Sequence, residues 1–239
     1  LEGNYPDTNI TKYGNINASI KLFNFGGNHD NPISSTELNK INKKLLRRIH
    51  NSGYNGICFD IEANVKDDSP LFELFNKKFK LLKEFNFIVL VTVSWFRPYA
   101  WKPVPEGPKG EESESFIINI LNSNYIDIIA PQLYTNNCND SDIYIFIKAH
   151  ITSHFWSEKL INAWKNTKLK IVPIVNKAEI DISKNRVINF NTEKIKPFLK
   201  CIQSIFSNYD GESYMDYVTA NRKDGTCTAS FSGWEDDCN

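Results

Sequence analysis

Apolar residues along the chain follow two alternating patterns. Six runs rich in β-branched and aromatic residues predict strands, at residues 19–27, 54–62, 87–95, 125–135, 169–177 and 227–235. Between most of them, apolar residues recur at the spacing of one helix face. This spacing predicts helices at residues 36–49, 69–85, 113–123, 141–166 and 192–206.

The first predicted helix also carries recognisable end signals. Leu38, Ile41, Leu45 and Ile49 fall on one face of it, so this face is expected to be buried. Ser34 and Glu37 have the spacing of a capping box at its start. Gly53 is the expected stop, since glycine readily adopts the conformation that ends helices.

Regular alternation of strands and helices predicts a parallel sheet with helical crossovers. Two α/β architectures fit, an open doubly wound sheet and a closed (β/α) barrel. No glycine-rich nucleotide motif follows the first strand, and polar residues cluster at the carboxyl ends of several strands, which favours the barrel. We expect one domain over residues 1–239, with an irregular segment at 1–18 and a Pro/Gly/Glu-rich rim loop at 102–115.

The strand at 54–62 carries two acids in an apolar run. Side chains alternate along a strand, so Cys58, Asp60 and Glu62 share one face and the apolar residues between them share the other. Successive residues on one face are about 6.6 Å apart, so a charge on Asp60 disfavours a charge on Glu62. We therefore expect Glu62 to hold its proton towards neutral pH and to act as a general acid.

Two other interpretations of these acids are open from spacing alone. The pair could be a buried one tied to Arg or Lys, or it could bind Mg²⁺. A metal site would need further acids or histidines at neighbouring strand ends. The residues found there have the chemistry of sugar-binding groups, which favours a site without metal or cofactor: Asn24, Ser94, Gln132, Tyr134 and Trp234.

Four motifs together resemble glycoside hydrolase family 18, the chitinases and their relatives. NGICFDIE (55–62) resembles the family signature DGxDxDxE, and KLFNFGG (21–27) resembles its SxGG strand. APQLYTNNC (130–138) is similar to the Gln-x-Tyr strand of plant-type class III chitinases, and SFSGWED (230–236) to the last barrel strand. They occur in the family's order. The resemblance implies a (β/α)8 TIM barrel and a substrate that contains β-1,4-linked N-acetylglucosamine.

The resemblance also implies roles for the matched residues. Glu62 would protonate the glycosidic oxygen while the substrate's own N-acetyl carbonyl attacks the anomeric carbon. Asp60 and Tyr134 would orient the acetamido group and stabilise the oxazolinium-like intermediate. The substrate-binding residues would be Gln132 in the same pocket, Trp234 stacked under the sugar ring, Asn24 and Cys58.

Two departures from the family pattern bear on function. The signature's middle Asp is Cys58 here and its first Asp is Asn55. Cysteine cannot supply the carboxyl that pairs with Asp60 in the family, so a chitinase-like lectin or inhibitor is the alternative to an enzyme. The SxGG strand is normally the third of eight, so the chain is expected to lack the first one or two strands. A further polypeptide segment is then a candidate to complete the barrel.

Composition limits the classes of binding partner that we expect and bears on where the protein is located. The chain has 28 basic and 28 acidic residues, which gives no reason to expect a nucleic acid or an anionic membrane. No apolar run approaches the ~20 residues of a membrane span. Sequons at Asn9, Asn17 and Asn139 point weakly to a secreted, extracellular protein. Five cysteines leave at least one thiol unpaired within the chain.

Overall fold

The computed structural model describes residues 19–26, 33–61, 70–94, 110–133, 157–176, 178–181, 186–189, 192–211 and 213–215. The chain divides into two compact units, residues 1–130 and residues 131–239, and each is described by itself. The expectation of a single domain stays a prediction. The predicted strand at 227–235 and the segment 1–18 lie outside the described residues.

A parallel sheet forms the centre of the first unit. Its strands are β1 (Leu22–Gly26), β2 (Gly56–Ile61) and β3 (Ile88–Ser94), adjacent in that order, and β4 (Ile128–Leu133) begins in the same unit. Helices separate these strands along the chain, so every neighbouring pair from β1 to β3 is parallel. The predicted α/β class with a parallel sheet is confirmed.

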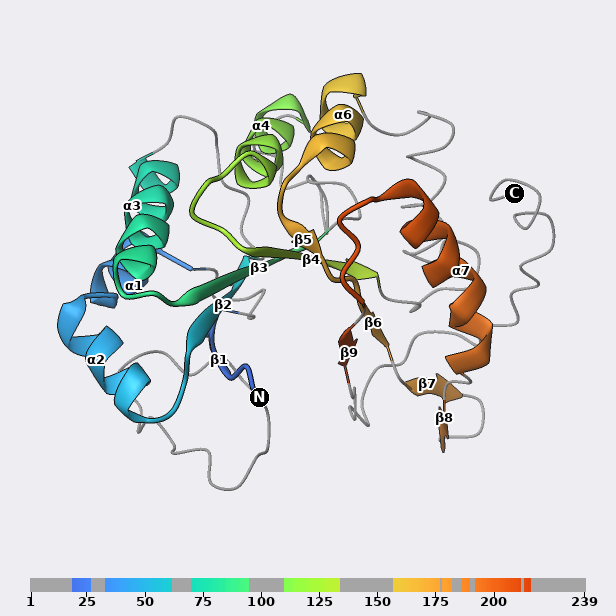
Figure 1. Cartoon of the computed structure of the whole chain (residues 1–239), viewed down its shortest axis with the longest axis horizontal. Helices are drawn as coiled ribbons and strands as arrows, with labels where there is room; N and C mark the ends of the chain where they lie inside the picture. The colour runs from blue at the N-terminus through green and yellow to red at the C-terminus, as the bar shows by residue number, and fades with distance from the viewer. Residues whose placement is uncertain are drawn as a thin grey trace. The chain divides into compact units, whose positions relative to one another are not determined.

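Four helices of the first unit connect these strands: α1 (Ser35–Lys40), α2 (Lys43–Asn51), α3 (Pro70–Glu84) and α4 (Gly110–Leu121). Figure 1 shows α1, α2 and α3 together on one side of β1, β2 and β3. An aromatic core joins the sheet to α3, where the Phe59 ring lies 5.1 Å from Phe79 and 6.3 Å from Phe75, both edge-on. Burial of this apolar face stabilises the unit.

The helix predicted over 36–49 is broken in two. Ser34 Oγ accepts from the Glu37 amide as expected, but Asn42 starts a second helix by accepting from the amides of Lys44 and Leu45. An asparagine side chain competes with the helical backbone for these donors, which explains the break. The predicted apolar face is nevertheless buried, and Gly53 ends α2 with a φ of 90°.

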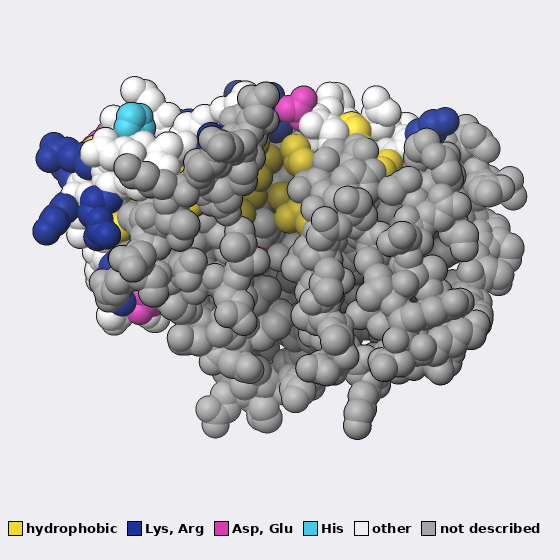
Figure 2. All heavy atoms as spheres, turned by 90° about the horizontal axis from the view of Figure 1, so that it is seen from below, with side chains coloured by type: hydrophobic (Ala, Val, Ile, Leu, Met, Phe, Trp, Pro, Cys, Tyr) yellow, Lys and Arg dark blue, Asp and Glu magenta, His cyan; other side chains and the backbone are white. Residues whose placement is uncertain are grey.

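The outer face of α2 is strongly basic. Four of its exposed residues are basic, Lys43, Lys44, Arg47 and Arg48, while Leu45, Leu46 and Ile49 are buried beneath it. In Figure 2, Lys and Arg side chains gather at the left edge, the side on which Figure 1 shows α2.

Among the described helices, none combines the length and the apolar character needed to cross a membrane.

The second unit continues the strand and helix alternation. The last residues of β4 pair with β6 (Ile174–Asn176), and β6 pairs with β9 (Ser213–Met215), all in parallel. Helices α6 (Glu158–Asn166) and α7 (Thr192–Ile205) belong to this unit. The ring centroids of Trp164 in α6 and Phe206, just after α7, lie 6.2 Å apart.

Three features of the second unit differ from the sequence expectation. The run at 169–177 forms two short strands, β5 (Lys170–Ile171) and β6, on either side of buried Pro173, because proline cannot donate to a strand ladder. An antiparallel hairpin of β7 (Ala178–Asp181) and β8 (Arg186–Asn189) was not predicted, and neither was β9. Of the helix predicted at 141–166, the part before 157 lies outside the described residues.

Candidate functional site

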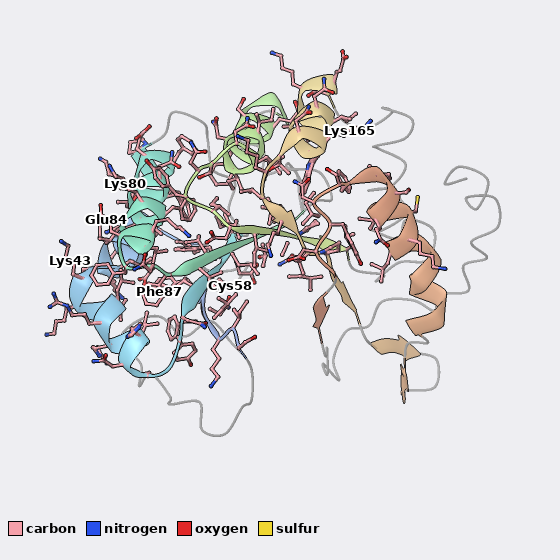
Figure 3. All side chains as sticks on the ribbon, in the orientation of Figure 1. Lys43, Cys58, Lys80, Glu84, Phe87 and Lys165 are labelled. Carbon is pink, nitrogen blue, oxygen red and sulfur yellow. The ribbon has the colours of Figure 1, made fainter. Side chains whose placement is uncertain are left out.

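The two faces of strand β2 have different chemistry. Ile57, Phe59 and Ile61 are buried on the face that packs against the helices, whereas Cys58 and Asp60 on the opposite face are half-buried. This alternation confirms the faces predicted for residues 57–61, whereas Glu62 lies outside the described residues. In Figure 3, Cys58 lies on the side of β2 away from α2 and α3, whose outer surfaces carry Lys43, Lys80 and Glu84.

Strand register brings further polar side chains next to Cys58 and Asp60. Asn24 of β1 lies opposite Cys58, and Thr92 of β3 lies opposite Asp60. We call Asn24, Cys58, Asp60 and Thr92 the β2 polar cluster. Three of its four members were predicted as site residues. Thr92 was missed. It lies two positions before Ser94, and this spacing places both hydroxyl side chains on one face of the strand.

The side chains of Asp60 and Thr92 form a direct hydrogen bond. The Thr92 hydroxyl donates to Asp60 Oδ1 at 2.5 Å, the short end of the range for a hydroxyl bound to a carboxylate. Thr92 is 3% exposed, so its hydroxyl is held within the sheet rather than in solvent. The contact gives Asp60 a fixed donor on the neighbouring strand.

Cys58 is a free thiol that resists ionisation. Burial first, and the negative charge of Asp60 second, raise the pKa of the Cys58 thiol far above its ordinary value. The thiol is therefore neutral at physiological pH and is a poor nucleophile. Cys201, in the second unit, takes part in a disulfide.

Two glycines let the strands of this site approach closely. A Cβ on Gly56 would collide with the Ile88 carbonyl and the Leu22 side chain on the flanking strands. A Cβ on Gly26 would collide with the Asp60 carbonyl and with Ile33, and Gly26 has a φ of 98°. Both glycines belong to motifs that resemble the family, and close packing accounts for both.

Asn55 has a structural role that explains its departure from the signature. Its amide oxygen accepts from the Lys21 amide at 2.7 Å, and its amide nitrogen donates to the Ser19 carbonyl at 2.8 Å. A carboxylate has no hydrogen to donate to Ser19. Asparagine at this position therefore fastens the start of β2 to the residues just before β1.

The remaining predicted site residues are described only in part. Gln132 is 9% exposed near the end of β4 and belongs to the second unit. Glu62, Tyr134 and Trp234 lie outside the described residues. The prediction that these side chains share one pocket with Asp60 stays a prediction. Within the described ranges, no group of three or more His, Cys, Asp or Glu side chains could hold a metal ion.

Comparisons with known proteins give a weak likeness in structure alone. No family model matches the chain, and no curated protein matches it. Among solved structures, catalytic domain 2 of the Group II chitinase from Ostrinia furnacalis is similar at 13% identity and a TM-score of 0.32. The match covers 66% of this chain and 45% of that chain, less than half its length. Because a TM-score this low carries no argument, the candidate site rests on its own motifs and geometry.

Proposed function

We propose that the chain is a chitinase-like glycoside hydrolase that cleaves β-1,4-linked N-acetylglucosamine in chitin or a similar glycan. In this proposal the parallel sheet is part of a (β/α) TIM barrel with the active site at the carboxyl ends of its strands. One observation carries it: Asp60 lies near the carboxyl end of β2, on the polar face, within a segment that resembles the family signature.

The proposed reaction needs no metal or cofactor. Glu62 donates its proton to the glycosidic oxygen as the bond from that oxygen to the anomeric carbon breaks. The acetamido carbonyl oxygen of the same sugar forms a bond to that carbon, which gives an oxazolinium intermediate. Water then opens the ring and returns a proton to Glu62. Asp60 and Tyr134 hold the acetamido group, while Gln132, Asn24 and Trp234 contact the sugar.

A lectin or inhibitor without turnover is the second candidate, and Cys58 favours it. The family signature has an aspartate where Cys58 stands, and a neutral thiol offers no carboxylate to work with Asp60. Such a protein would keep the sugar-binding groups and lose catalysis. Under either candidate, we propose an extracellular protein whose partner is a glycan containing N-acetylglucosamine.

The two candidates are separated by measuring cleavage and binding of chitooligosaccharides together. If the chain is an enzyme, Glu62→Gln should lower turnover about 10²–10⁴-fold, because glutamine keeps the shape but has no proton to donate. Calorimetric titration should show nearly unchanged binding by this variant. Product release is followed by chromatography of the reducing ends.

Cys58→Asp is the complementary variant, because it restores the signature. Higher turnover in Cys58→Asp than in wild type would show that Cys58 weakens an otherwise complete site. If both proteins bind chitooligosaccharides and neither cleaves them, the lectin candidate is correct. If neither protein binds, both candidates are wrong.

A further inference from the structure

Thr92 is the member of the β2 polar cluster to which the family resemblance assigns no role. It lies on β3 directly across from Asp60, and its hydroxyl donates to Asp60 Oδ1. Threonine is β-branched and therefore stiff about its first side-chain torsion. Because Thr92 is also buried, the donor has little freedom to turn away from Asp60.

The hydrogen bond from Thr92 favours the ionised form of the Asp60 carboxyl. A hydroxyl that donates to a carboxylate favours its charged form. Among the described residues of β2, the neighbouring titratable group is the Cys58 thiol, whose pKa burial raises, so it stays protonated. Glu62, which the sequence places on the same face, lies outside the described residues. The residues paired with Asp60 are Gly26 on β1 and Thr92 on β3, and those paired with Cys58 are Asn24 and Leu90. None of these four side chains titrates.

We propose that Thr92 is a positioning residue that holds Asp60 ionised and turned towards β3. In the proposed reaction, which this inference rests on, a carboxylate fixed in this way is ready to orient the acetamido group and to offset the positive charge of the oxazolinium. Thr92 thus supplies a donor to Asp60 in a site where position 58 has a thiol in place of a carboxyl.

Two substitutions separate the hydroxyl from the shape of the side chain. Thr92→Val keeps the branched shape and removes the donor, while Thr92→Ser keeps the donor and removes a methyl group. The carboxyl carbon of Asp60 is followed by NMR against pH in protein labelled at aspartate, with the signal assigned by its loss in Asp60→Asn. Thr92→Val should raise the pKa of Asp60 by about one unit, and Thr92→Ser should restore most of the shift.

The titration decides the inference without any catalytic assay. Equal Asp60 titration curves in wild type and Thr92→Val would overturn it, and so would equal shifts in the valine and serine variants. Thermal unfolding of both variants checks that each is folded. Failure of every variant to bind chitooligosaccharide would overturn the proposed function and leave the titration result standing.

In an active enzyme, a kinetic measurement gives the same distinction. Thr92→Val should lower kcat about tenfold with a smaller change in KM, and should move the acidic limb of the pH profile of kcat to higher pH. Thr92→Ser should keep most of kcat and the original limb. An unchanged limb in Thr92→Val would contradict the positioning role even where activity confirms the enzyme.

Discussion

Two aspartates in the first unit show how differently one sheet can use the same side chain. Asp127 lies just before β4. Lys83 Nζ donates a hydrogen bond to each of its carboxylate oxygens at 2.8 Å, and the Val89 amide donates another at 2.8 Å. Asp60, near the carboxyl end of β2, receives the Thr92 hydroxyl and lies beside the Cys58 thiol. One acid is bound by a cation and the backbone, and the other is bound by a neutral hydroxyl.

The difference follows from the ends of the strands at which the acids lie. Asp127 ties Lys83 of α3 to the start of β3, so its charge serves the packing of helix on sheet. Asp60 lies towards the edge where parallel α/β sheets carry their functional groups. We therefore expect Asp127 to stabilise the fold and Asp60 to act in the proposed site, and the following variants test these two roles.

The largest effect is expected from exchanging each acid for its amide. Asp60→Asn should lower turnover of chitooligosaccharides by at least about 10²-fold, because it removes charge stabilisation of the intermediate. Asp127→Asn should leave turnover within about twofold and lower the free energy of unfolding by about 1 kcal/mol, a modest value because the Lys83 pair is partly exposed. Steady-state kinetics and urea unfolding of both variants check this. The reverse pattern would contradict the assignment.

A second test disturbs the backbone at Asp60 and leaves its side chain in place. Gly26→Ala should lower the free energy of unfolding by about 3 kcal/mol, because its Cβ meets the Asp60 carbonyl at a positive φ. Gly53→Ala is the matched control: φ is 90° and nothing lies within 4 Å, so about 1 kcal/mol is expected. Urea unfolding measures both. Equal losses would mean that crowding at Asp60 has no part in the effect.

The smallest effect concerns pH. The folded pKa of Cys58 is raised, so above the unfolded thiol pKa of about 8.5 the unfolded chain releases a proton that the folded chain retains. Stability contributed by Cys58 is complete below that pH and falls above it, by about 1.4 kcal/mol per pH unit. Urea unfolding at pH 8 and pH 9.5 should show this fall in wild type and a smaller one in Cys58→Ser. Parallel losses in the two proteins would place the alkaline sensitivity elsewhere.

Much of the first unit could be predicted because its strands alternate clearly. The two faces of β2, the helix-facing aromatic residues and the stop at Gly53 follow from spacing and from glycine chemistry. The break at Asn42 was missed because the apolar face continues across it without interruption. Short strands such as β9 were missed because three residues are too few to show the alternation that distinguishes a strand from a loop.

The candidate site was only partly predictable, for a similar reason. Alternation places Asn24, Cys58 and Asp60 on one face, but pairing between strands decides which residues meet, and one sequence does not give that register. Spacing puts Thr92 on the same face of its strand as Ser94, but only the register of β2 with β3 places it opposite Asp60. The two hydrogen bonds of the Asn55 side chain to the residues before β1 could not be predicted for the same reason.

The most direct test of the central claim is a crystal structure of Glu62→Gln with a chitooligosaccharide. We expect a sugar at the carboxyl ends of β1, β2 and β3, with its acetamido nitrogen about 2.7–3.2 Å from the Asp60 carboxylate. Residue 62 should point to the same face as Asp60. A sugar bound away from Asp60, or residue 62 turned towards α3, would contradict the account.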